Sequence, residues 1–343
     1  MRRFIIRTDA GGEIGFGHAV RSISLAKHLR AFYGIEAIFY SNPYDKLRNL
    51  YQSYGFQYVL NGGLSEKQLL CKIKDEYPGA VLFIDKLYPY DRETIRSLKD
   101  GLKIIMFHNE CEGMFESHFA IFPSAHLNDE ILEDERWPYA PAEFLYGPEY
   151  VIINDHVVKS VAQHKNSNSH PYIAISTGAT DPEGIFIRIL EWINESKVTA
   201  KIKALYGFDF YHKAALLSLL PRLKPTIEVK EFNYDDLLSS HLAISSVGVT
   251  IYELIFANIP VITIGHIQKN AIAGEILQKR YGCNYHLGMF KNITGDQLIS
   301  AIQHLWNSEE ALQGIKEKQA NLIDEKGINR LTEIIYDCCS NNQ

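Results

Sequence analysis

The sequence predicts an α/β protein with two doubly wound domains, each a parallel sheet with helices on both faces. Short apolar runs alternate with amphipathic stretches along the chain, a pattern typical of parallel sheets covered by helices. A polar segment at residues 163–171 separates two groups of about six runs, and 343 residues suffice for two domains. We therefore expect two Rossmann-like domains facing each other across a cleft, with ligands at the carboxyl ends of the strands.

The first half opens with an apolar run at 4–6, a turn with four glycines at 10–17 and a helical pattern at 19–30. Further apolar runs indicate strands at 37–40, 57–60, 80–84, 103–107 and 119–122. Helical spacing indicates helices at 65–76 and 91–100. The predicted N-terminal domain covers residues 1–160.

The second half repeats this alternation after the polar segment, which has the composition of a linker. Strands are expected at 172–176, 201–205, 226–229, 242–245 and 260–264. Helices are expected at 184–193, 211–220, 250–257, 270–280, 294–306 and 309–336. The predicted C-terminal domain covers 171–325, followed by a helix and tail at 326–343.

Composition narrows the class of protein. Hydrophobic residues make up 46% of the chain, charged residues 22%, and the net charge is −6, which argues against a nucleic-acid partner. No apolar run is long enough for a signal peptide or a membrane span. The five cysteines are scattered, with no zinc-like spacing. We expect a cytoplasmic protein with reduced thiols, no cofactor and no metal; the oligomeric state stays open.

His18 follows the glycine-rich turn at the start of the first predicted helix. Glycines let the backbone approach a ligand, and the N–H groups of a helix start can bind an anion. Imidazole titrates nearest neutrality, so a histidine here can take a proton from water or from a sugar hydroxyl. The alternative for a single histidine is a capping or buried structural role.

Two turns of the second half have the composition of phosphate sites. Residues 176–182 lead from a strand into a helix through Ser, Thr and Gly, with Asp181 able to cap that helix. Residues 244–254 form a matching turn, with Glu253 one turn inside the following helix. There a carboxylate can hold two ribose hydroxyls while the helix start holds a diphosphate. Alternatively, the first turn is an ordinary connection and Glu253 only suits the helix dipole.

Several motifs, in one order, resemble a known family over about the first 290 residues. Residues 15–26, GFGHAVRSISLA, are similar to the GxGHxxRxxxLA signature of the UDP-sugar hydrolases of pseudaminic acid biosynthesis. Those enzymes cleave UDP-2,4-diacetamido-2,4,6-trideoxy-β-L-altropyranose and are relatives of the GT-B glycosyltransferase that forms lipid II. Residues 177–182 resemble the family's GGTDP turn, 146–150 its GPxY element, and 245–260 its uridine-binding stretch.

The resemblance implies a GT-B-like fold and a role for each matching residue. His18 matches the catalytic histidine, which activates or orients the attacking water, and Glu253 matches the ribose-binding carboxylate. The nucleotide side is implied to include Gly178, Thr180, Ser246, Gly248 and Thr250. The sugar or acceptor side is implied to include Gly15, Gly17, Arg21 and Asp85.

The chain departs from the family on the sugar side. Asp85 is kept, but Lys86 stands where the family often has His, and His108-Asn109 replace an acidic pair. The family's Asn-Gln element has its order changed, to Gln268 and Asn270. We expect these positions to contact the sugar or acceptor. His108 is then a second acid/base group or a polar loop residue, and Lys86 a ligand contact or a surface lysine.

Three functions follow from these patterns. The first is a hydrolase that releases UDP from a UDP-linked acetamido-deoxy sugar in bacterial surface-glycan biosynthesis of the pseudaminic acid kind. The second is a GT-B glycosyltransferase with the same donor and another acceptor, which the altered sugar side favours. The third is a binder of nucleotide sugars without catalysis, against which His18 argues, since binding UDP needs no base.

Overall fold

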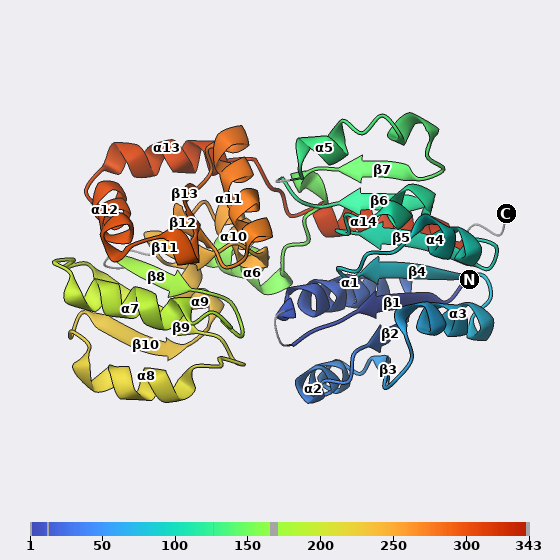
Figure 1. Ribbon diagram of the computed structural model, residues 1–343, viewed down its shortest axis with the longest axis horizontal. Coiled ribbons are helices and arrows are strands. Elements are labelled where there is room, and N and C mark those ends of the chain that lie inside the picture. Colours follow the sequence, from blue (N-terminus) through green and yellow to red (C-terminus); the bar gives the residue numbers. More distant parts are fainter. Residues whose placement is uncertain (1, 12–13, 126, 165–170, 341–343) are drawn as a thin grey trace. The chain divides into compact units, whose positions relative to one another are not determined.

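The computed structural model describes residues 2–11, 14–125, 127–164 and 171–340, and its chain folds into two compact units. Residues 1–152 and 325–343 make the first unit, and residues 153–324 make the second. Each unit has one sheet, and every pair of neighbouring strands in both sheets runs parallel (Figure 1). The two doubly wound α/β domains predicted from the sequence are thereby confirmed.

The first sheet has seven strands in the order β3-β2-β1-β4-β5-β6-β7. Their bounds are β1 Phe4–Thr8, β2 Ala37–Ser41, β3 Gln57–Leu60, β4 Ala80–Asp85, β5 Leu102–Phe107, β6 Phe119–Phe122 and β7 Glu143–Tyr146. The order reverses between β1 and β4, where Thr8 pairs with Asp85 at the carboxyl ends of both strands. Such a switch point opens a crevice for ligands.

Helices cover both faces of this first sheet (Figure 1). They are α1 Gly17–Tyr33, α2 Asp45–Ser53, α3 Glu66–Glu76, α4 Arg92–Leu98, α5 Asp129–Leu132 and α14 Gly327–Ser340. Ile5, Leu82 and Ile104 share one buried cluster with residues of α3 and α4. On the other face, α1 packs against α14, which also contacts β4. Successive side chains of each strand therefore reach opposite cores, which explains their unbroken apolar runs.

The second sheet has six strands in the order β10-β9-β8-β11-β12-β13. Their bounds are β8 Tyr172–Ser176, β9 Lys201–Tyr206, β10 Ile227–Glu231, β11 Leu242–Ser246, β12 Val261–Gly265 and β13 Tyr285–Met289. The helices are α6 Asp155–His164, α7 Ile185–Glu195, α8 Lys213–Leu219, α9 Tyr234–Leu238, α10 Val249–Phe256, α11 Gln268–Tyr281, α12 Gly295–Trp306 and α13 Glu309–Gln319. Its switch point lies between β8 and β11.

Local sequence explains where several helices begin and end. Ser65 and Gln68 form a capping box at the start of α3, and Thr294 and Gln297 form one at the start of α12. Gly34 ends α1 with φ of +64°, a conformation that glycine adopts without steric cost. Gly34 thereby fixes the end of α1, the helix that carries His18.

Some elements differ from the sequence prediction. All eleven predicted strands form, but β7 and β13 were not predicted, because both lie at sheet edges with largely half-buried residues. The helices α2, α5, α6 and α9 were also missed. The predicted helix at 309–336 is divided, since α13 ends at Gln319 and Asn321 takes a φ of +64°.

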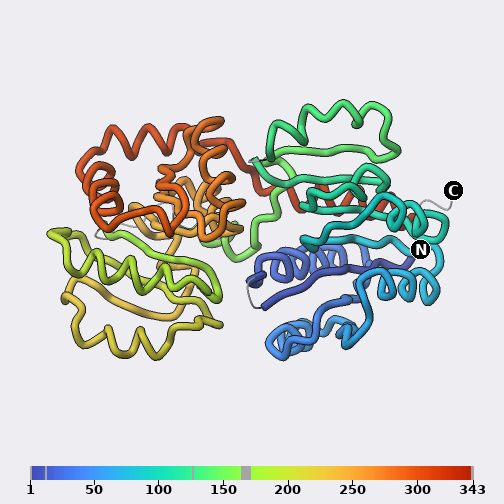
Figure 2. The backbone as a smooth tube through the Cα atoms, in the orientation of Figure 1, coloured from blue at the N-terminus to red at the C-terminus, as the bar shows by residue number. Residues whose placement is uncertain are grey.

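The division into units also differs from the predicted domain bounds. Helix α6 belongs to the second unit, where Ser160 hydrogen-bonds Asp235 over 3.3 Å. Helix α14 returns to the first unit, where Arg330 donates to the Glu149 carbonyl over 2.8 Å. Figure 2 shows the red end of the chain running back beside the blue segment. Of the predicted linker at 163–171, residues 165–170 lie outside the described residues.

Candidate functional site

The glycine-rich turn of the first unit closes on itself between β1 and α1. The N–H of Gly11 donates to the carbonyl of Gly15 over 2.9 Å, and both glycines have positive φ, +91° and +70°. A Cβ on Gly11 would lie 2.9 Å from the Tyr44 ring, so the turn can pack there only with glycine. Residues 12–13 lie outside the described residues. The turn delivers Gly17 and His18 to the first turn of α1.

His18 is paired with Asp85, the last residue of β4. His18 Nδ1 lies 2.6 Å from Asp85 Oδ1. Arg21 and Ser22, from the same helix, donate to the same carboxyl group: Arg21 Nε to Oδ2 over 2.7 Å, Arg21 Nη2 to Oδ1, and Ser22 Oγ to Oδ2 over 3.2 Å. The neighbouring strand positions of β1 and β4 bring these residues together.

The electrostatics keep Asp85 ionised. Its side chain is fully buried, and burial alone would raise the pKa of this carboxyl. The charge of Arg21 and the hydrogen bonds from Arg21 and His18 outweigh burial and hold the Asp85 pKa well below its usual range. An ionised carboxylate only accepts hydrogen bonds, so the 2.6 Å contact with Asp85 places the proton on His18 Nδ1. Arg21 Nη2 lies 2.9 Å from the same nitrogen and then donates to Asp85 alone. The Nε2 lone pair is then left to accept a proton.

A second group of charges lies buried beside this pair. Arg7 donates to both Glu66 and Asp9, with Arg7 Nε 2.9 Å from Glu66 Oε1 and Arg7 Nη2 3.0 Å from Asp9 Oδ2. Lys86 Nζ lies 2.6 Å from Glu66 Oε2 and 2.9 Å from Asp9 Oδ2. Tyr90 donates to Glu66 Oε1 over 2.6 Å. We call Arg7, Asp9, Glu66, Lys86 and Tyr90 the buried charge cluster.

The buried charge cluster changes the interpretation of Lys86. Lys86 is not a surface lysine, because its side chain is 16% exposed and its ammonium pairs with two carboxylates. A ligand contact by Lys86 stays a prediction. No sequence signal marked Glu66, which is 59 residues from Arg7 along the chain. Only the sheet order β3-β2-β1-β4, with α3 following β3, brings the two together.

His108 and Asn109 follow β5 at the same carboxyl edge. The rings of His108 and His18 lie edge to face, 6.3 Å apart between centroids. His108 has a φ of +54°. Asn109 is buried and donates to the carbonyls of Lys86, over 2.6 Å, and Tyr88, over 3.1 Å. Asn109 therefore shapes the loop after β4, and its predicted contact with substrate stays untested.

In the second unit the turn after β8 is built around Asp181. The Asp181 carboxylate accepts the N–H groups of Ile185, over 3.1 Å, and Phe186, over 2.8 Å, as the sequence predicted for a capping residue. Gly178 has a φ of +98°, and a Cβ there would lie 3.8 Å from Ser246 Oγ. The turn after β8 and the turn after β11 are thus neighbours at the edge of this sheet. The first contains Gly178 and the buried Thr180, and the second contains Ser246.

The turn after β11 leaves the start of α10 open. Gly248 is the N-cap residue, is exposed, and has only open space where a Cβ would stand. No described side chain caps this helix start, so the backbone N–H groups near Thr250 remain available to an anion. The turn is fixed from behind by Asn270, which donates to the Val247 carbonyl over 2.6 Å.

Glu253 lies one turn further along α10 and is buried. Burial raises the pKa of its carboxyl to about 7, against the opposing effect of a hydrogen bond from Tyr234. Of the two predicted residues in the α11 region, Gln268 is exposed at the helix start, while Asn270 contacts backbone. Tyr234, which no sequence signal marked, joins the site through Glu253.

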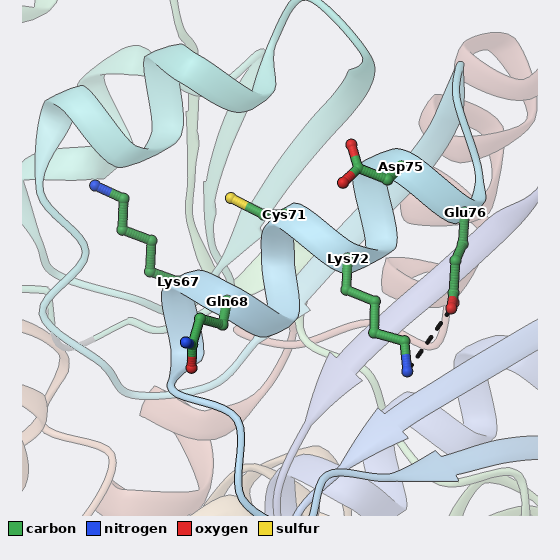
Figure 3. Close-up of a pocket in the computed structure, with 6 residues that line it drawn as sticks. All are labelled: Lys67, Gln68, Cys71, Lys72, Asp75 and Glu76. Atoms are coloured by element: carbon green, nitrogen blue, oxygen red, sulfur yellow. Dashed lines mark ion pairs between the residues drawn. The ribbon is translucent and has the colours of Figure 1, made fainter.

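Other features of the described chain lie apart from these residues. An open depression lies along α3 (Figure 3). It is lined by Lys67, Gln68, Cys71, Lys72, Asp75 and Glu76. It contains none of the predicted site residues. Among the described residues, no group of three or more His, Cys, Asp or Glu side chains is arranged to hold a metal ion. No described helix combines the length and apolar character needed to cross a membrane.

The fold defines the class: two Rossmann-like parallel-sheet units in one chain match the GT-B fold of glycosyltransferases. MurG of Acinetobacter baumannii is similar with a TM-score of 0.64 at 11% identity, over 97% of this chain and 99% of MurG. MnaA of S. aureus, in a structure with UDP, is similar with a TM-score of 0.66 at 12% identity, over 98% and 96% of the two chains.

Two curated proteins are similar in sequence, and no family model matches the chain. An uncharacterized protein of Methanocaldococcus jannaschii is 24% identical over 271 residues, 76% of this chain. The match spans only 55% of that archaeal protein. The spore coat polysaccharide biosynthesis protein SpsG of Bacillus subtilis is 20% identical over 340 residues, which is 97% of each chain.

Proposed function

We propose that this protein cleaves a UDP-sugar, with His18 as the general base that activates water at the anomeric carbon. The observation that carries the proposal is the pair of His18 and Asp85 at the switch point of the first sheet. A buried, ionised carboxylate bound to Nδ1 orients the imidazole and leaves Nε2 as the proton acceptor. A hydrolase or a glycosyltransferase needs such a base to take the proton from a weak nucleophile, either water or a sugar hydroxyl.

The nucleotide is proposed to bind in the second unit. The open start of α10 at Gly248 and Thr250 supplies N–H groups for the diphosphate, and Glu253 supplies an acceptor for the ribose. Gly178, Thr180 and Ser246 lie beside it on the neighbouring turns. The choice of UDP is supported by the sequence motifs and by the structural similarity to MnaA, whose structure contains UDP.

The sugar and the pathway belong to the same proposal. The motif resemblance favours an acetamido-deoxy sugar of the kind used in pseudaminic acid biosynthesis. The similarity to SpsG, named for spore coat polysaccharide biosynthesis, supports a place in surface-polysaccharide synthesis. Gln268, exposed at the start of α11, is the residue on this side we propose to contact the sugar or acceptor.

A glycosyltransferase is the second candidate. His18 would then take the proton from an acceptor hydroxyl instead of water. Two observations favour it: similar solved structures include a calicheamicin glycosyltransferase, with a TM-score of 0.62, and the residues after β4 and β5 differ from those of the hydrolases. The two functions share the donor site and differ only in the nucleophile.

The test is UDP release from a panel of UDP-acetamido-deoxy sugars without any acceptor. Wild type is compared with His18→Ala and with His28→Ala, a control that removes a histidine ten residues along the same helix. The expected result is rapid release from one sugar, lowered about 10²–10⁴-fold by His18→Ala alone. Release only after an acceptor is added would select the glycosyltransferase. Undiminished release by His18→Ala would refute the mechanism for either enzyme.

Reaction in H₂¹⁸O then identifies the bond that breaks. Attack by water at the anomeric carbon places ¹⁸O in the released sugar and leaves UDP unlabelled. Label in the β-phosphate of UDP would mean that water attacks phosphorus, and the proposed position of His18 would be wrong.

A further inference from the structure

The ribose-side carboxylate depends on one tyrosine. Tyr234, the first residue of α9, donates its hydroxyl to Glu253 Oε1 over 3.0 Å. Within the part of the chain that the structure describes, no other group hydrogen-bonds the Glu253 side chain. One carboxyl oxygen is therefore fixed by Tyr234, and Oε2 keeps its full capacity to accept.

Tyr234 is itself held from the other side. Its hydroxyl hydrogen-bonds with the Asn154 side chain, and Asn154 Oδ1 already accepts the N–H of His156 over 2.9 Å. Because the phenol proton is given to Glu253, the amide NH₂ of Asn154 is the group that donates to the phenol oxygen. The rings of His156 and Phe232 pack edge to face on the tyrosine ring, at 5.5 Å and 5.1 Å between centroids. The phenol cannot turn away without losing these contacts.

The direction of this chain of hydrogen bonds is defined while Glu253 is ionised. Burial, the Glu253 charge and the hydrogen bond to Glu253 raise the pKa of the Tyr234 hydroxyl above its usual value, and Asn154 opposes them only in part. The hydroxyl therefore keeps its proton at any physiological pH and donates it to the ionised Glu253 carboxylate. A terminal carboxyl torsion is broad and nearly two-fold, so without this donor the Glu253 carboxyl group would be free to rotate.

We propose that Tyr234 is a positioning residue that makes the nucleotide site select ribose over 2′-deoxyribose, acting through Glu253. The inference rests on the proposed function, because it takes the ligand to be a ribonucleotide held at α10. Fixing Oε1 aims Oε2 at one place, and two neighbouring hydroxyls on a rigid sugar ring need an acceptor in a defined place. A ligand without the 2′-hydroxyl gains less from this arrangement.

The experiment is calorimetric binding of UDP and of 2′-deoxy-UDP to wild type, Tyr234→Phe and Tyr172→Phe. Phenylalanine keeps the ring contacts of Tyr234 and removes only its hydroxyl. Tyr172→Phe is the matched control, because the Tyr172 hydroxyl donates to the Asp236 carbonyl in the same helix α9, over 2.7 Å, without contacting Glu253. The ratio of two affinities on one preparation is unaffected by any fraction of unfolded protein.

Wild type and Tyr172→Phe are expected to prefer UDP, and Tyr234→Phe to lose about tenfold of that preference. Equal weakening of both ligands by Tyr234→Phe, with the preference kept, would show a merely structural tyrosine and overturn this inference alone. The same loss of preference in Tyr172→Phe would assign the effect to α9 as a whole and also overturn it. Wild type that binds UDP without preferring it would refute the ribose role of Glu253. No binding of UDP would refute the proposed function itself.

Discussion

Replacing Asp85 by asparagine tests the orientation of His18 directly. Asparagine keeps the size of the side chain and one acceptor oxygen, but it loses the charge and presents an NH₂ group toward the helix. With a donor facing Nδ1, the imidazole is driven to carry its proton on Nε2, and the base points the wrong way. We expect UDP release to fall about 10²–10⁴-fold, the range of a positioned general base, as an incorrect tautomer does in hydrolase triads.

The same change has a cost in stability that the structure allows us to bound. Asp85 is fully buried and Arg21 is only 11% exposed. Removing one partner of such a pair costs about 3–5 kcal/mol, and the retained acceptor oxygen places Asp85→Asn near the lower figure. Urea unfolding measures this loss. Release is then assayed at a temperature where the variant is folded, with UDP binding as the check, since the proposed nucleotide residues lie in the other unit.

Asp91→Asn serves as the control for Asp85→Asn. Asp91 caps α4 through the Thr94 N–H over 2.6 Å and has no contact with His18 among the described residues. It is expected to leave UDP release unchanged. The reasoning would be refuted if folded Asp85→Asn released UDP at the wild-type rate while His18→Ala did not. His18 would then work without an orienting carboxylate, and the Asp85 contact would serve the fold alone.

Four further predictions concern other parts of the two units. The pKa of Glu253 is raised by burial to about 7 from 4.5 in the unfolded chain. Its contribution to stability is thus complete below about pH 4.5 and is lost as pH rises through 7, by up to about 3 kcal/mol. Glu253→Gln should remove this pH dependence from urea unfolding curves. Gly248→Leu should leave the melting temperature unchanged but weaken UDP binding at least about tenfold, because its side chain would enter the open start of α10. Gly178→Ala should instead lower stability by about 1 kcal/mol or more, given its φ of +98°. Finally, Glu66→Gln should destabilise the protein by about 3–5 kcal/mol in thermal or urea unfolding, because it removes a counter-charge of the buried Arg7 guanidinium. Glu36→Gln is the surface control. A smaller loss of stability for Glu66→Gln than for Glu36→Gln would contradict the role of the buried charge cluster.

Strands could be predicted from the sequence where every residue of the strand is buried. Strands such as β4, Ala80–Asp85, are buried along their length and appear as unbroken apolar runs, so the parallel sheets could be predicted. The edge strands β3 and β7 share one burial pattern, an exposed residue followed by three half-buried ones, and only β3 was predicted. An edge strand with one neighbour needs no continuous apolar run.

The candidate site shows the same limit in its side-chain pairs. His18 could be singled out from the turn before it, and Asp85 from a motif, but their contact joins residues 67 positions apart. Only the pairing of β1 with β4 makes them neighbours. Glu66 and Tyr234 carry no local signal at all, since each acts through a partner on another element. Partners of this kind become visible only once the sheet order is known.

The return of α14 to the first unit means that the second unit is, in topological terms, an insertion within the first. Ribosomal synthesis therefore finishes the second unit, where we propose that the nucleotide binds, before α14 of the first unit is made. Until then the α1 face against which α14 packs is uncovered. In the order of translation, the proposed nucleotide site can thus be complete before α14 supports the helix that carries His18.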